Sequence, residues 1–176
     1  SEVKRVLRTV NYLRLSIENH WKINSVKFVW KILEKNFTDD EMREFVLKKG
    51  VFSSNILLFT IANHAQSLDV CEFFWLKIKS LFDIESLKKL LLEKDGNETA
   101  LDESALTNNK NSFEFLLEKV YWEVFELEDL IRMNDHNFYK YAILHSSISI
   151  VEVASNFLKE RLTRDELREF FKINSN

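Results

Sequence analysis

The sequence predicts an all-α fold, arranged as a helical-repeat solenoid of about four units that are each about 37–45 residues long. Three observations predict it. First, the 176 residues include no Pro and two Gly, where average usage gives about nine and about twelve. The tight corners of β-sandwiches and barrels therefore lack their usual residues. Second, apolar side chains recur at helical spacing. Third, a nine-residue motif recurs along the chain.

The recurring motif occurs in its clearest form twice. FTDDEMREF at 37–45 and LTRDELREF at 162–170 are identical at six of nine positions, and weaker copies occupy 82–90 and 125–133. Thr38 and Thr163 each precede a Glu by three residues. This spacing is typical of a capping box, in which the two side chains satisfy free backbone N–H groups at a helix start. An apolar residue before each cap, paired with one at the fourth helical position, predicts a hydrophobic staple. The pairs are Phe37/Met42, Phe82/Leu87, Phe125/Leu130 and Leu162/Leu167.

Each motif is the third helix of a three-helix unit, since two further helical patterns precede it. The first helices are expected over about 5–20, 55–65, 99–108 and 137–146. The second helices are expected over about 25–36, 68–81, 112–123 and 149–160. The third helices are expected over about 39–48, 84–93, 126–133 and 164–172. The units span about 1–50, 51–95, 96–135 and 136–176 of a single repeat domain. We expect this domain to be an excerpt of a longer array, with further repeats of the same chain as neighbours.

The units are expected to share buried positions, because constant steps along the chain bring similar side chains into register. Steps of 45, 43 and 37 residues give three aligned sets, and a step of 45 pairs Trp30 with Trp75. The sets are Leu13, Leu58, Leu101 and Phe138; Ile17, Ala62, Ala105 and Ala142; and Phe28, Phe73, Leu116 and Val153. A single unit cannot bury its apolar stripe alone, but stacked units can.

The third unit carries a family resemblance. DGNETALDESA at 95–105, followed by FEFLLE at 113–118, resembles the opening and second helix of an ankyrin repeat. The added third helix is similar to that of long-repeat ankyrin arrays from arthropods and their symbionts. Asp102 stands where the motif has His, as do Arg14, Phe59 and Tyr139 in the other units, so the usual turn-bracing hydrogen bonds are expected to be absent. The units either keep ankyrin fingers or pack as a purely helical stack.

The resemblance implies that the chain is a protein–protein interaction module with a curved surface. Its partner-facing positions carry over to Leu15, Glu18, Thr60, Asn63, Glu103, Leu106, Lys140 and Ile143. Trp21 and Trp122 do not recur between units and are candidate binding anchors, although core packing is the favoured interpretation for both. The alternative function is a structural or regulatory spacer within a larger multidomain protein, such as a symbiont effector or toxin.

Catalytic chemistry is not expected. The single Cys71 falls on an apolar helical position and is predicted to be a core residue, and the four His do not have metal-ligand spacing. The acidic residues of the motif recur with it, which assigns them to helix capping. We therefore expect no enzyme, no cofactor and no metal, and a protein partner of unknown identity.

Charge and hydropathy favour an intracellular protein, most simply a cytoplasmic one, that neither binds nucleic acid nor inserts into a membrane. The net charge is −3, no apolar run reaches the length of a bilayer span, and one Cys permits no internal disulfide. Residues 1–35 carry a balance of +5 and residues 113–135 a balance of −5. This asymmetry indicates either solvated helix faces or ends suited to head-to-tail contact.

Overall fold

The structure is a computed structural model that describes residues 22–47, 58, 61–62, 68–94, 98–132, 138–145 and 148–173. The regular elements of these residues are helices, which confirms the all-α class. The helix predicted over 5–20 and most of the one predicted over 55–65 lie outside the described residues.

The described helices agree with the predicted spans to within a few residues. The first helices are α8 (Ala100–Leu106) and α12 (Phe138–His145). The second helices are α3 (Ile23–Asn36), α6 (Leu68–Leu81), the continuous helix formed by α9 (Lys110–Phe115), η1 (Leu116–Tyr121) and α10 (Trp122–Val124), and α13 (Ile148–Arg161). The third helices are α4 (Asp39–Val46), α7 (Ile84–Leu91), α11 (Leu127–Arg132) and α14 (Arg164–Ile173).

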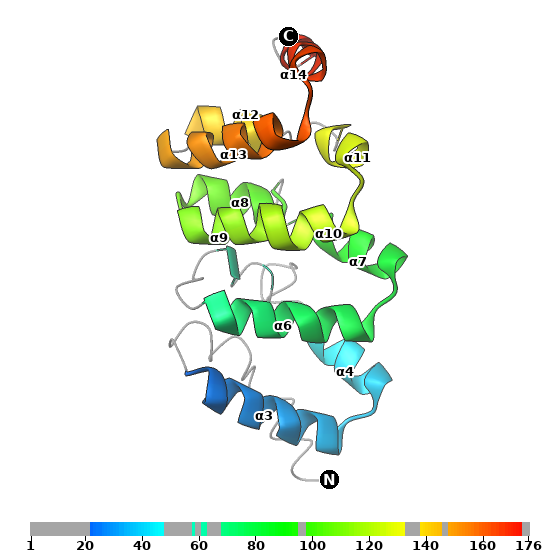
Figure 1. The fold of residues 1–176 in the computed structure, drawn as a ribbon. Coiled ribbons are helices and arrows are strands. Elements are labelled where there is room, and N and C mark those ends of the chain that lie inside the picture. Colours follow the sequence, from blue (N-terminus) through cyan, green and yellow to red (C-terminus); the bar gives the residue numbers. More distant parts are fainter. Residues whose placement is uncertain are drawn as a thin grey trace.

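The second helices are layered in chain order, from α3 through α6 and the α9–η1–α10 helix to α13 (Figure 1). The third helices line one side of these layers, and α4 contacts both its own α3 and the α6 of the next layer. In the same view α8 lies behind α9 and α12 behind α13, and α8 packs against α12. One continuous core of buried apolar side chains extends through the layers.

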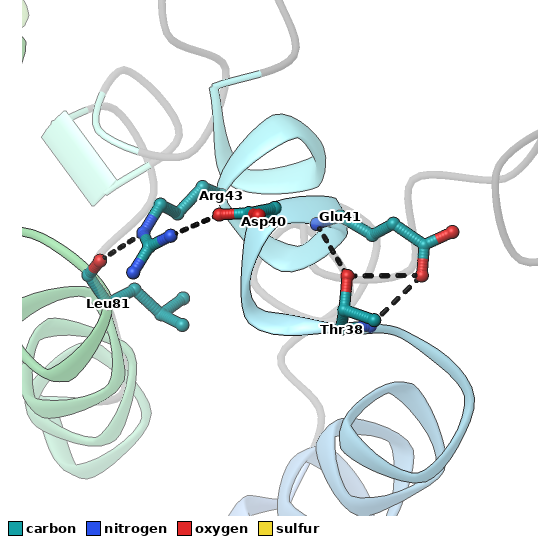
Figure 2. A network of polar contacts seen from close by, with 5 residues as sticks. All are labelled: Thr38, Asp40, Glu41, Arg43 and Leu81. Atoms are coloured by element: carbon teal, nitrogen blue, oxygen red, sulfur yellow. Dashed lines mark hydrogen bonds and ion pairs between the residues drawn. The ribbon is translucent and has the colours of Figure 1, made fainter.

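The turn between each second and third helix is built in the same way in every layer. One apolar residue follows the second helix, the cap comes next, and the third helix begins. Figure 2 shows the first of these turns: the Glu41 amide donates to Thr38 Oγ1 (3.3 Å), and the Thr38 amide donates to Glu41 Oε2 (3.0 Å). Thr163 and Glu166 form the same pair of bonds at 3.4 and 2.8 Å. Both predicted capping boxes are confirmed, and such a cap contributes about 0.5–2 kcal/mol.

Most of the aligned positions are buried as predicted. Leu58 and Leu101 are buried, and Ala62, Ala105 and Ala142 are inaccessible to solvent. Small residues at such positions let helix backbones approach closely, as α8 and α12 do.

Leu116 is out of register in the aligned set that also contains Phe28, Phe73 and Val153. Phe28 is 66% exposed and Phe73 is half-buried, whereas Leu116 is fully buried. The shift of Leu116 is caused by a π-helical segment, η1, in the third layer. The α9–η1–α10 helix has 15 residues, while α3, α6 and α13 each have 14. A π-bulge absorbs one extra residue within an α-helix, so Leu116 corresponds to the buried Phe74 rather than to Phe73.

Asp102 also corrects an expectation. Its carboxylate accepts from the Thr99 amide (2.9 Å) and from Thr99 Oγ1 (2.8 Å), and the Asp102 amide donates to Thr99 Oγ1 (3.3 Å). Both residues are buried, and together they form a capping box at the start of α8. The turn before this helix is therefore braced by Asp102, although the His of the ankyrin motif is missing.

Candidate functional site

Aromatic and charged side chains join the first two layers. The Trp30 indole N–H on α3 donates to Glu34 Oε1 one turn later (2.7 Å), and the same oxygen accepts from Lys77 Nζ on α6 (2.6 Å). The Lys77 ammonium lies 5.9 Å from the centre of the Trp30 ring, at cation–π distance. One carboxylate oxygen thus accepts hydrogen bonds from both an indole and an ammonium, and the ammonium belongs to the next layer.

The second interface repeats this arrangement with the two charges exchanged. The Trp75 indole N–H on α6 donates to Glu123 Oε2 on α10 (2.9 Å), and this oxygen also accepts from Lys79 Nζ (2.5 Å). Lys79 is one turn after Trp75 and lies 5.8 Å from its ring centre. Here the carboxylate, rather than the ammonium, comes from the next layer. Trp30 and Trp75 are both buried, which confirms their predicted packing role.

Trp122 has a related position at the third interface. Its ring meets Phe157 of α13 edge-on at 5.6 Å between centres, and the Arg161 guanidinium lies 4.9 Å from its centre. The side chain is 36% exposed. Trp122 therefore contributes to interlayer packing, the interpretation that the sequence favoured, and one edge of its side chain is in solvent.

The interlayer carboxylates have shifted acidities. Burial by itself raises the pKa of Glu123, but hydrogen bonds from Lys79 and Trp75 outweigh that effect and hold the pKa below its ordinary value of 4.5. The pKa of Glu34 is lowered in the same way. Burial raises this pKa, but the hydrogen bonds from Lys77 and Trp30 outweigh that effect. Both groups thus favour the charged state in the folded chain.

A pH dependence of stability follows from these shifts. Because the native pKa is depressed, the contribution of Glu123 is present above 4.5 and is lost as the pH falls from 4.5 through the native pKa. We expect Glu123→Gln to lower the free energy of unfolding at neutral pH and to flatten its acid-side slope. Urea unfolding at a series of pH values measures both effects. Equal slopes for the variant and the parent chain would contradict the assignment, and Lys79→Met should flatten the slope as well.

Part of the predicted partner-facing set lies on two adjoining helices. Glu103 and Leu106 are half-buried on α8, while Lys140 and Ile143 are exposed on α12. Ile143 is 54% exposed, and its neighbour Leu144, which the sequence did not single out, is 62% exposed. We call these five residues the α8/α12 face. The other predicted positions, Leu15, Glu18, Trp21, Thr60 and Asn63, lie outside the described residues.

A hollow of about 180 Å³ opens between the second and third layers. Leu68 and Glu72 of α6 line one side, and Glu118 and Lys119 of the π-helical segment line the other. The remaining lining residues are Asn111, Glu114 and Phe115. The lining thus combines three glutamates with one lysine.

The side chains of Cys71 and Tyr121 are embedded in the packing. Cys71 is buried, which confirms its predicted core position, and burial raises the pKa of its thiol to about 12. Burial also raises the pKa of Tyr121, whose hydroxyl donates to the Leu91 carbonyl (2.7 Å). The described residues contain no group of three or more His, Cys, Asp or Glu arranged to hold a metal. His20, His64 and His136 lie outside those residues.

The helices and their packing place the chain in the all-α class. None of the described helices is both long enough and apolar enough to cross a bilayer. Comparison of the chain with protein-family models, curated proteins and solved structures found no match.

Proposed function

We propose that the chain is a helical-repeat scaffold of ankyrin-like units that binds a protein partner on its α8/α12 face. The observation that carries the proposal is the contrast between two sets of positions on the same helices. Leu101, Ala105 and Ala142 are buried and apolar, as scaffold positions should be. Ile143 and Leu144 are large, apolar and exposed on α12, and exposed apolar patches on repeat proteins suit partner binding.

Three features of the described residues support a preformed surface. The α8 helix is fixed at its start by the buried Thr99–Asp102 box. Ser112 Oγ at the start of α9 donates to the Ile61 carbonyl (2.8 Å), which joins the second and third layers. The Tyr121 hydroxyl joins the same two layers at the other end of the helix. A surface that is ordered before binding loses little conformational entropy in the complex.

The proposal is tested with the purified chain as bait and with two variants. Ile143→Asp combined with Leu144→Ser changes the α8/α12 face, and Leu76→Asp changes an equally exposed apolar residue of α6. We expect a partner to bind the parent chain and the Leu76 variant alike. The face variant should bind it at least about tenfold more weakly, as removal of a binding hot spot does. Circular dichroism of all three proteins checks that the helices are retained.

Two results would overturn the proposal. A partner that binds all three proteins equally well uses another surface. If the parent chain retains no partner, the alternative function, a structural or regulatory spacer of a larger protein, becomes the better account.

A further inference from the structure

The contact between the first two described layers includes a helix end that is capped by a side chain from the neighbouring layer. Arg43 of α4 donates from Nε to the carbonyl of Leu81, the last residue of α6, at 2.6 Å (Figure 2). Its guanidinium also pairs with Asp40 one turn earlier on α4, which holds it in position. A cation at a helix C-terminus complements the helix dipole and satisfies a carbonyl that has no partner within its own helix. A side chain of the first layer thus caps the C-terminal end of α6 in the second layer.

The same device is present on α14, the third helix of the last described layer. Arg168 has the position in its motif that Arg43 has in the first, and it pairs with Asp165 (3.0 Å) as Arg43 pairs with Asp40. Its side chain is 59% exposed. Among the described residues no helix end meets it, because no described layer lies beyond α14. Phe171, on the next turn of α14, is also exposed.

The opposite end of the stack carries the matching half of a layer contact. Phe73 of α6 faces α3, and its ring meets Trp30 edge-on at 6.0 Å. Phe28 has the same position on α3, nine residues before the apolar residue of the turn, as Phe73 has on α6. It therefore faces away from α6, and it is the most exposed aromatic side chain of the described residues. Phe28 of the first described layer is therefore exposed at the position where Phe73 of the second layer packs against α3.

We propose that the chain associates head to tail with a second copy of itself, so that α14 of one copy receives α3 of the next. Arg168 would cap the C-terminal end of α3, where Asn36 is in register with Leu81. Phe28 would pack against the last layer of the neighbouring copy. A second copy fits these ends because one chain carries both halves of a contact that it already uses between α4 and α6. Such an association is heterologous, and it leaves both outer ends open for further copies.

Sedimentation velocity over a wide concentration range tests the proposal with the 176-residue chain. We expect the weight-average mass to rise with concentration beyond that of a dimer. Phe28→Asp and Arg168→Glu should each suppress this rise, with association at least about tenfold weaker. Both side chains are exposed, so the layers within each copy should remain folded. Leu76→Asp is the matched control, because Leu76 is exposed on α6 and away from both ends.

Mixing the two variants distinguishes head-to-tail contact from a symmetric dimer. Each variant retains one intact end, so the mixture should form a one-to-one complex that does not grow further. A mass that stays monomeric at every concentration would overturn the proposal. So would an assembly that neither substitution weakens. The Ile143 and Leu144 variant should assemble like the parent chain, so failure of this proposal is distinguishable from failure of the proposed function.

Discussion

Replacing Trp30 with alanine is expected to lower the free energy of unfolding by about 3–5 kcal/mol. Trp30 is 2% exposed, and its ring lies 6.0 Å from the ring centres of both Phe73 and Phe74. Its removal leaves a cavity between α3 and α6 and takes the indole donor from Glu34. A loss of this size is a large fraction of the stability of a single domain. Denaturant unfolding followed by circular dichroism measures it without depending on tryptophan fluorescence.

Trp122 provides the matched control for this substitution. It also packs between two layers, but more than a third of its side chain is exposed, so less apolar surface is lost when it is truncated. We expect Trp122→Ala to cost about 1–2 kcal/mol. Equal losses for the two substitutions would contradict the view that Trp30 is a structural element of the interface while Trp122 lies at its edge.

Local signals explain why the helices could be predicted from the sequence. The bonds between Thr38 and Glu41 join residues three positions apart, so the spacing alone determines that they can form. The staple works over a similarly short distance, and Met42, Leu87 and Leu130 are all buried as predicted. Because a helix start is determined within one turn, a single sequence suffices to locate it.

The contacts between layers could not be predicted in the same way. Lys77 and Glu34 are 43 positions apart, and Trp75 and Glu123 are 48 apart, so no local pattern pairs them. Their charges are also exchanged from one interface to the next. A search for the same residue at the same position of each unit therefore misses them. The α8/α12 face was predicted in part, since Ile143 was named and the more exposed Leu144 was not.

The failed alignment of Leu116 has a more specific cause. Sequence comparison assumes a constant 3.6 residues per turn, and the π-helical segment changes that number locally. Once one residue of the segment is disregarded, Phe113, Leu116 and Leu117 match Cys71, Phe74 and Trp75 of α6. All six side chains are buried. The extra residue thus shifts the alignment of residue numbers between the layers. The equivalent side chains still occupy the same buried positions.

Two single-residue deletions should therefore have opposite outcomes. Deleting Lys119, an exposed residue of η1, should convert the 15-residue helix into a 14-residue α-helix whose two halves keep their orientations. We expect the free energy of unfolding to change by about 1 kcal/mol or less. Deleting the exposed Leu76 from α6 shortens a regular helix and turns one half by about 100° relative to the other. Buried side chains such as Val70 and Cys71 then leave the core, at a cost of about 5 kcal/mol or more.

Denaturant unfolding and amide hydrogen exchange of the two deletion variants measure this difference directly. Exchange is informative because the π-helical segment has its own backbone bonds, such as that from the Trp122 amide to the Leu117 carbonyl. After deletion of Lys119, the amides of this helix should be protected as uniformly as those of α6 in the parent chain. Comparable destabilisation by the two deletions would mean that the bulge is required for packing, and that the third layer does not share the register of its neighbours.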